Sequence, residues 1–201
     1  MGSDASRVWP IVHAERARLV SDLEGMAVGN WSTPSLCPGW SVHDVLAHLV
    51  DTAKTSRIGF VRRMIAARFD FDGDNALGIT RQKHDDPAAT LQAMQAAQYL
   101  TLTPPVAWAT RFVEAFVHGE DIRRPLGIAA EYPVDAVVEA LRYQSKTAVA
   151  LGGGRERVQG LRLVATDAEF ASGDGEVVTA RGIDLLLAVS GRPGPVELPP
   201  R

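Results

Sequence analysis

Apolar residues recur at helical spacing over the first three quarters of the chain. This periodicity predicts helices, because positions three and four apart share one face of a helix. We expect five of them, over about 8–26, 41–69, 87–99, 106–124 and 134–151. The second begins with the spacing Ser41-x-x-Asp44, which is typical of a capping box.

Two segments between these helices lack the apolar repeat. The first, 30–40, contains two prolines and a glycine and is predicted to be an ordered loop that Trp31 and Trp40 anchor to the bundle. The second, 70–78, alternates acids with glycine and is also predicted to be a loop. It lacks the ligand spacing and the closing glutamate of an EF-hand, so we do not expect it to bind calcium.

The pattern changes after the three glycines at 152–154. Short β-type runs at 161–166 and 176–180 flank a glycine-rich turn, and 183–189 forms a short apolar helix. About 50 residues rarely bury enough surface to fold alone. The predicted fold is therefore mainly α: a helical bundle over 1–151 and a small α/β appendage over 155–201 that packs on the bundle.

Composition and charge exclude several kinds of partner. The formal net charge is −3 and no long run of one sign occurs, so no nucleic acid is expected to bind. No apolar stretch approaches the roughly 20 residues that cross a bilayer, so we expect no membrane partner and a cytoplasmic location. Cys37 is the single cysteine, which excludes an internal disulfide. We expect it to be a buried or half-buried structural residue.

Candidate metal ligands come from the five histidines. Glu114 precedes His118 by one helical turn, so both side chains can reach one ion. Asp121 lies one turn further on, where it could orient a ligand or simply be a charge near the helix end. His48 borders the apolar stripe of its own helix, whereas His43 is predicted to be a surface residue. A glutamate and a histidine at this spacing also occur as a plain solvated pair, so spacing alone does not establish a site.

Three longer motifs add a family resemblance. They are Trp31-Ser-Thr-Pro-Ser-Leu-Cys-Pro-Gly-Trp-Ser-Val-His-Asp-Val-Leu-Ala-His-Leu49, Val113-Glu-Ala-Phe-Val-His-Gly-Glu-Asp-Ile-Arg-Arg-Pro-Leu-Gly127, and the segments 160–167 and 185–192. In this order they resemble the DinB-like metal-binding family, in particular the actinobacterial branch related to mycothiol-dependent maleylpyruvate isomerase. The resemblance implies an up-and-down four-helix bundle. It also implies a divalent metal on His48, Glu114 and His118.

The resemblance implies zinc as the metal, although nickel, iron(II) or cobalt accept the same ligands. It further implies a metal-dependent thiol transferase or isomerase that uses mycothiol or a similar small thiol on a small electrophile. We expect a monomer or homodimer, between which the sequence does not decide. Cys37 is not expected to be the nucleophile. Two alternatives stay open: a metal-containing protein that binds a small molecule without chemistry, and a structural or regulatory protein whose triad holds no metal.

Overall fold

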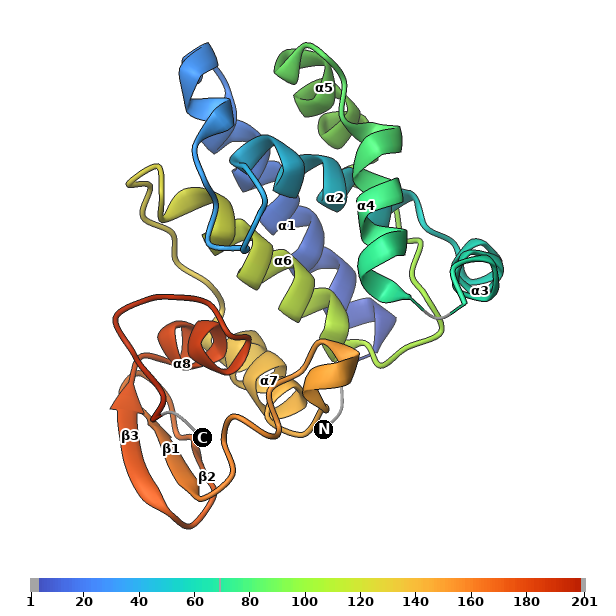
Figure 1. Ribbon diagram of the computed structural model, residues 1–201. Coiled ribbons are helices and arrows are strands. Elements are labelled where there is room, and N and C mark those ends of the chain that lie inside the picture. Colours follow the sequence, from blue (N-terminus) through green and yellow to red (C-terminus); the bar gives the residue numbers. More distant parts are fainter. Residues whose placement is uncertain (1–3, 69, 200–201) are drawn as a thin grey trace. The chain divides into compact units, whose positions relative to one another are not determined.

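The computed structural model describes residues 4–68 and 70–199, and its contacts divide the chain into two compact units (Figure 1). The first unit comprises the described part of Met1–Trp108 together with His118–Ala129. The second comprises Ala109–Val117 and the described part of Ala130–Arg201. The boundary falls inside one continuous helix, α6 (Ala109–Arg123), so that Ala109–Val117 belongs to the second unit and the rest of the helix to the first.

The first unit is entirely helical within the described residues. Its elements are α1 (Ala5–Leu23), a short 3-10 helix η1 (Val28–Ser32), α2 (Val42–Lys54), α3 (Arg57–Ala66), α4 (Phe71–Gln82), α5 (Pro87–Ala97) and the second half of α6. Helix α2 packs against both α4 and α5, and α1 packs against α5. The core consists of aliphatic side chains with Trp31 among them, which include Leu23, Val45, Leu46, Met94 and Ile122.

The predicted capping box at the start of α2 is confirmed. The Ser41 hydroxyl accepts a hydrogen bond from the Asp44 backbone N–H at 3.2 Å, and the Asp44 carboxylate accepts one from the Ser41 N–H at 2.9 Å. These two bonds satisfy backbone donors that have no partner inside the helix. Lys83 binds the other Asp44 oxygen at 2.7 Å and so ties the end of α4 to the same cap.

The predicted single helix over 41–69 is wrong, because the chain ends α2 at Lys54 and starts α3 at Arg57. Position 69 itself lies outside the described residues. The Thr55 hydroxyl donates to the Asp51 carbonyl at 2.7 Å, and the Ser56 hydroxyl accepts from the Gly59 N–H at 3.1 Å. Serine and threonine favour such local bonds to the backbone, which compete with helix continuation. The apolar repeat runs through this break because each of the two helices has its own apolar positions.

The predicted loop over 70–78 is also wrong, because α4 occupies Phe71–Gln82. The Asp70 carboxylate caps the helix by accepting from the Gly73 N–H at 3.0 Å. Asp72 and Asp74 lie in the first turn, where the helix dipole stabilises negative charge. The alternating acids are therefore the start of a helix, and the glycines are tolerated within it.

Arg63 joins α2, α3 and α4. Its guanidinium donates to both oxygens of Asp74 at 2.8 Å and to Asp51 Oδ2 at 2.7 Å. A third contact at 3.0 Å reaches the Thr55 hydroxyl. Both carboxylates are buried, so this two-pronged pairing compensates their charges. The position of α3 depends on it.

Gly78 gives this network its space, which leads to a prediction. A Cβ on Gly78 would lie 2.6 Å from Asp51 Oδ2, too close for any real contact. We expect Gly78→Ala to push the carboxylate away from Arg63 and to lower the free energy of unfolding by about 1–3 kcal/mol. Gly29→Ala is the matched control, because no atom lies within 4 Å of its added Cβ. Urea denaturation of both variants measures the difference, and equal stabilities would contradict the prediction.

The second unit contains helices and a small sheet. Beyond the first half of α6 it has α7 (Val134–Gln144), a 3-10 helix η2 (Val149–Leu151), β1 (Leu161–Ala165), β2 (Ala171–Ser172), β3 (Glu176–Ala180) and α8 (Gly182–Val189). The sheet order is β2-β1-β3, with β1 antiparallel to β2 and parallel to β3. The two predicted strands and the final helix are confirmed, whereas the two-residue β2 was not predicted. Helix α7 packs against α8, and Gln144 on α7 donates to the Ser190 hydroxyl at 3.0 Å.

The mainly helical fold class is confirmed. No helix among the described residues is long and apolar enough to cross a membrane. The division into a bundle over 1–151 and an appendage over 155–201 stays a prediction about domains.

Candidate functional site

The loop before α2 is held closed by its own hydrogen bonds. The Ser35 hydroxyl donates to the Trp40 carbonyl at 2.8 Å and accepts from the Cys37 N–H at 3.1 Å. The Ser35 N–H also donates to the Trp40 carbonyl, and Gly39 supplies the positive φ of 80° that the turn requires. Pro34 and Ser41 form a bridge at the base of the loop. The segment is thus an ordered loop, as predicted, and it fixes the position of the Trp40 ring.

Two of the predicted ligands meet beside Trp40 within the first unit. The imidazole of His48 on α2 and that of His118 on α6 have ring centroids 4.8 Å apart at 72°. The Trp40 ring stacks on His118 at 6.3 Å and 24°, and lies tilted against His48 at 5.1 Å. One indole therefore restricts the orientations of both imidazoles. The sequence predicted Trp40 only as a loop anchor, since nothing in its spacing showed which side chains it would touch.

Asp121 orients the His118 ring. Its carboxylate oxygen Oδ2 lies 2.9 Å from His118 Nδ1. Because a carboxylate accepts, the hydrogen of this bond lies on Nδ1, so in the neutral form of the ring Nε2 carries the lone pair. The side chain of Asp121 is fully buried, and its backbone carbonyl accepts from the Leu36 N–H in the loop at 3.2 Å. Of its two predicted roles, the geometry favours the orienting one.

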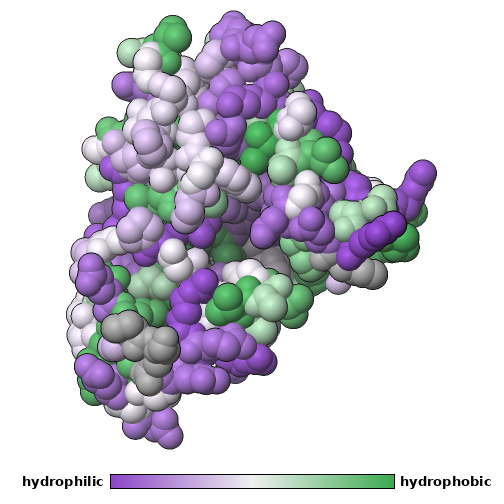
Figure 2. Space-filling view, in the orientation of Figure 1, coloured by the Kyte–Doolittle hydropathy of each residue, from purple (hydrophilic) through white to green (hydrophobic). Residues whose placement is uncertain are grey.

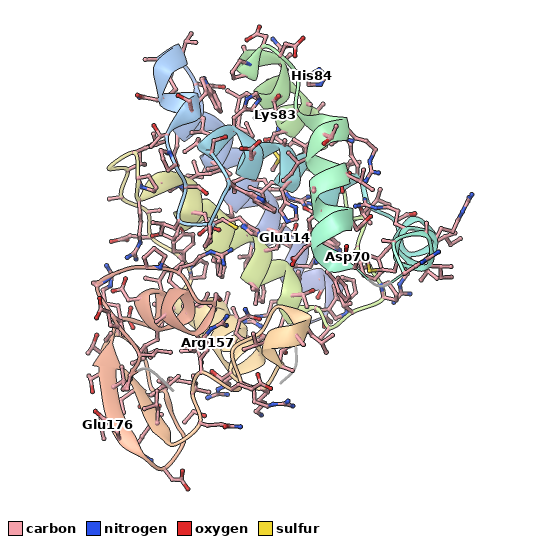
Figure 3. All side chains as sticks on the ribbon, viewed as in Figure 1. Asp70, Lys83, His84, Glu114, Arg157 and Glu176 are labelled. Atoms are coloured by element: carbon pink, nitrogen blue, oxygen red, sulfur yellow. The ribbon has the colours of Figure 1, made fainter. Side chains whose placement is uncertain are left out.

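Glu114 lies one turn before His118 on the same helix (Figure 3). It forms an ion pair with Arg111, in which guanidinium Nη1 and carboxylate Oε2 are 2.9 Å apart. The Arg111 side chain is almost fully buried, whereas that of Glu114 keeps 14% of its exposure. A ligand role would require Glu114 to share or exchange this pairing. Arg111 was not among the predicted site residues, although a cation three residues before an acid on a helix is a recognisable signal.

The arrangement of the two histidines suits a metal ion better than that of Glu114, which is paired with Arg111. In the part of the chain that the structure describes, no three histidine, cysteine, aspartate or glutamate side chains come together as a metal-holding group. The two imidazoles suit a metal ion well, because their rings are adjacent and because a carboxylate accepts a hydrogen bond from His118, as is usual for metal-bound histidines. Cys37 is half-buried against the apolar core, which agrees with a structural role. The triad of His48, Glu114 and His118 stays a prediction.

His43 is not a surface residue, so that prediction is wrong. The ring is buried, its Nε2 lies 2.8 Å from the Thr90 hydroxyl, and it meets Trp31 edge-on at 5.8 Å. Thr90 also accepts from the His84 N–H, which joins α2 to the start of α5. The spacing of five residues between His43 and His48 did not reveal the burial of His43, because α5, which is distant in sequence, covers the face of α2 that His43 occupies.

The burial of His43 predicts a pH dependence of stability. Burial lowers the pKa of His43 below the ordinary value of 6.5, and Lys83 adds to this effect. The folded state then resists protonation of His43. The neutral ring therefore contributes to the stability of the folded state above pH 6.5, and this contribution is lost as the pH falls through the lower pKa of the folded state. We expect the free energy of unfolding to fall between pH 7.5 and 5. This decrease in unfolding free energy should be smaller in His43→Gln, whose amide keeps a bond to Thr90. It should be unchanged in His84→Gln, because His84 is exposed.

The fold of the chain is similar to that of a known enzyme. The fold defines a DinB-like helical protein with a small α/β part. A crystal structure of the mycothiol-dependent maleylpyruvate isomerase matches with a TM-score of 0.64 at 16% identity, over 99% of this chain and 97% of that one. A histidine-to-alanine variant of that isomerase matches with a TM-score of 0.67 at 15% identity and the same coverage. These identities support the fold alone.

A match to a protein family comes from the sequence. Residues 12–103 match the family described as mycothiol maleylpyruvate isomerase N-terminal domain. The match contains the loop, Trp40 and His48, and the predicted resemblance is confirmed. No curated protein matches the chain.

Proposed function

We propose that the protein is a metal-dependent thiol transferase or isomerase that uses mycothiol or a similar small thiol and acts on a small electrophile in the cytoplasm. The proposed ligands are His48, Glu114 and His118, with zinc as the metal. The match of residues 12–103 to the mycothiol maleylpyruvate isomerase N-terminal domain family supports the thiol and the reaction class. The metal rests on the ligand set and on the predicted resemblance.

One observation carries the proposal: two histidines far apart in sequence lie ring against ring beside one tryptophan. Their centroid separation is 4.8 Å, and His48 is buried. If the two imidazoles only packed against each other, neither would require a hydrogen bond to a buried carboxylate. His118 Nδ1 donates to the Asp121 carboxylate, and burying that carboxylate costs several kcal/mol in desolvation.

The roles of the chain's own residues follow from these contacts. Asp121 holds the His118 ring in the tautomer whose Nε2 carries the lone pair, and Trp40 limits the rotation of both imidazoles. The closed loop around Ser35 keeps Trp40 in place and limits the access of water to the buried His48. A divalent cation bound to this set would lower the pKa of a thiol and favour the nucleophilic thiolate at neutral pH.

Elemental analysis of untagged protein tests the metal. We expect about one equivalent in the parent and little in His118→Ala. His84→Ala is the matched control, since this exposed histidine projects from the segment between α4 and α5 (Figure 3) and should not change the metal content. If the parent and both variants remain metal-free after incubation with zinc, the proposed triad is wrong.

Thiol-dependent turnover tests the chemistry separately. The zinc-loaded parent should consume members of a panel of small electrophiles, including maleylpyruvate, only when mycothiol is present, and His118→Ala should not. Metal and ligand binding without turnover would overturn the enzymatic proposal and favour the alternative of a non-catalytic binding protein.

A further inference from the structure

Helix α3 exposes an apolar stripe that the core does not use. Ile58, Val61 and Ile65 keep 75%, 45% and 63% of their exposure, at the spacing that places them on one face. Figure 2 shows hydrophobic and hydrophilic surface side by side where α3 lies. An isolated exposed aliphatic residue needs no explanation, whereas three in register on one short helix do.

Exposed arginines flank this stripe on both sides. At 100° per residue, Arg57 falls on one side of the three aliphatic positions and Arg62 on the other, whereas Arg68 follows the end of the helix in a turn with a φ of 52°. All three are exposed. Long basic side chains beside an apolar stripe can extend their charged ends away from it while their stems lie along it. The five helical residues, Arg57, Ile58, Val61, Arg62 and Ile65, form what we call the α3 outer face.

The charge around this face is one-sided. Residues 52–68 contain five arginines and lysines and no acid, in a chain whose net charge is −3, and of these five Arg63 is paired with Asp51 and Asp74. The next acids, Asp70 and Asp72, lie at the N-terminus of α4, where the helix dipole partly offsets their charge. The sequence shows no run of like charge here because apolar residues separate the basic ones.

The inner face of α3 keeps the outer face turned away from the bundle. Met64 is buried, and Arg63 reaches inward to Asp51 and Asp74 through bonds of 2.7 and 2.8 Å. Rotating the helix to bury Ile58 and Ile65 would break these bonds, leaving the buried Asp74 without Arg63 and Asp51 with only its longer pairing to Arg81 at 3.5 Å. The exposure of the stripe is thus a consequence of a specific anchor.

We propose that the α3 outer face binds peripherally to an anionic lipid surface. An amphipathic helix with arginines along its apolar stripe suits the boundary between anionic headgroups and acyl chains. A second copy of the chain fits less well, because a two-fold contact through α3 would bring arginines against arginines. Nucleic acid would use the arginines and leave the aliphatic stripe in water. The proposal departs from the expectation of no membrane partner, which depended only on the absence of a spanning segment.

Co-sedimentation of the full chain with lipid vesicles tests this proposal independently of any activity. We expect binding to vesicles of phosphatidylcholine with phosphatidylglycerol, little binding to phosphatidylcholine alone, and a strong decrease at 0.5 M salt. Ile58→Asp and Ile65→Asp should each weaken binding at least tenfold. Arg62→Gln should weaken it about fivefold, as loss of one basic residue near the surface implies.

Val28→Asp is the matched control, because Val28 is 81% exposed on η1, outside α3. It should bind as the parent does, with circular dichroism confirming that every variant is folded. No binding of the parent to anionic vesicles, or equal loss in Val28→Asp, would overturn the proposal. A dimer that Ile58→Asp dissociates, measured by light scattering, would assign the face to a second copy. Binding of an oligonucleotide that Ile58→Asp leaves intact, without vesicle binding, would assign it to nucleic acid.

Discussion

The Arg123→Met variant is expected to lose about 3–5 kcal/mol of unfolding free energy, because it leaves a buried carboxylate without its cation. Arg123 lies near the end of α6 with its side chain fully buried. It pairs with Glu15 on α1, which is also buried, and its Nε donates to Asp22 at 2.7 Å. Methionine fills a similar volume, so the loss should report the charge and not a cavity. Urea denaturation at neutral pH measures it.

Two controls separate this cause from general damage to the core. The double variant Glu15→Met with Arg123→Met should recover most of the stability, since it removes both charges. Burial raises the pKa of Glu15 even beside Arg123, so in the single variant Glu15 becomes neutral readily as pH falls. The destabilisation should therefore shrink between pH 7 and 5. A loss that is the same at both pH values and persists in the double variant would contradict this explanation.

Asp121→Asn is expected to weaken zinc binding by about 10–100-fold, provided that His118 is a ligand. The asparagine oxygen can still accept from His118 Nδ1, so the ring keeps its place. The imidazole becomes less basic without the neighbouring negative charge. Competition with a chromophoric chelator measures the affinity, and the backbone bond from Leu36 to the carbonyl of residue 121 is unaffected.

Glu120→Gln is the matched control for this variant. It removes one negative charge from the adjacent position on α6, where Glu120 pairs with Arg124 at 2.5 Å. Its zinc affinity should equal that of the parent. Equal weakening in both variants would indicate a general electrostatic effect and not a role for Asp121 in orienting the histidine.

The sequence predicted most helices of the fold because apolar periodicity reports which face is buried. It failed where local polar bonds compete with that signal. Thr55 and Ser56 end one helix and start another without interrupting the apolar repeat. Asp70, Asp72 and Asp74 look like a loop by composition, yet they cap and stabilise the start of α4. In both cases the deciding contacts are side chain to backbone or to the helix dipole.

The candidate site was predictable only in part, for a similar reason. The motifs identified His48 and His118, and the structure brings these two together. Helical spacing could not reveal that Trp40 touches both rings, or that α5 buries His43 against Thr90, because these contacts join distant segments. Periodicity describes one helix at a time, whereas a site depends on how several helices meet.

The packing of α7 against α8 has a consequence for synthesis of the chain. The apolar face of α7, which includes Val137, Ala140 and Leu141, is covered by a helix that begins at Gly182. At typical translation rates of 5–20 residues per second, this partner emerges from the ribosome only after a delay on the order of seconds. During that time the finished α7 is a nascent segment with an unprotected apolar face, and it is there that we expect a chaperone to bind the growing chain.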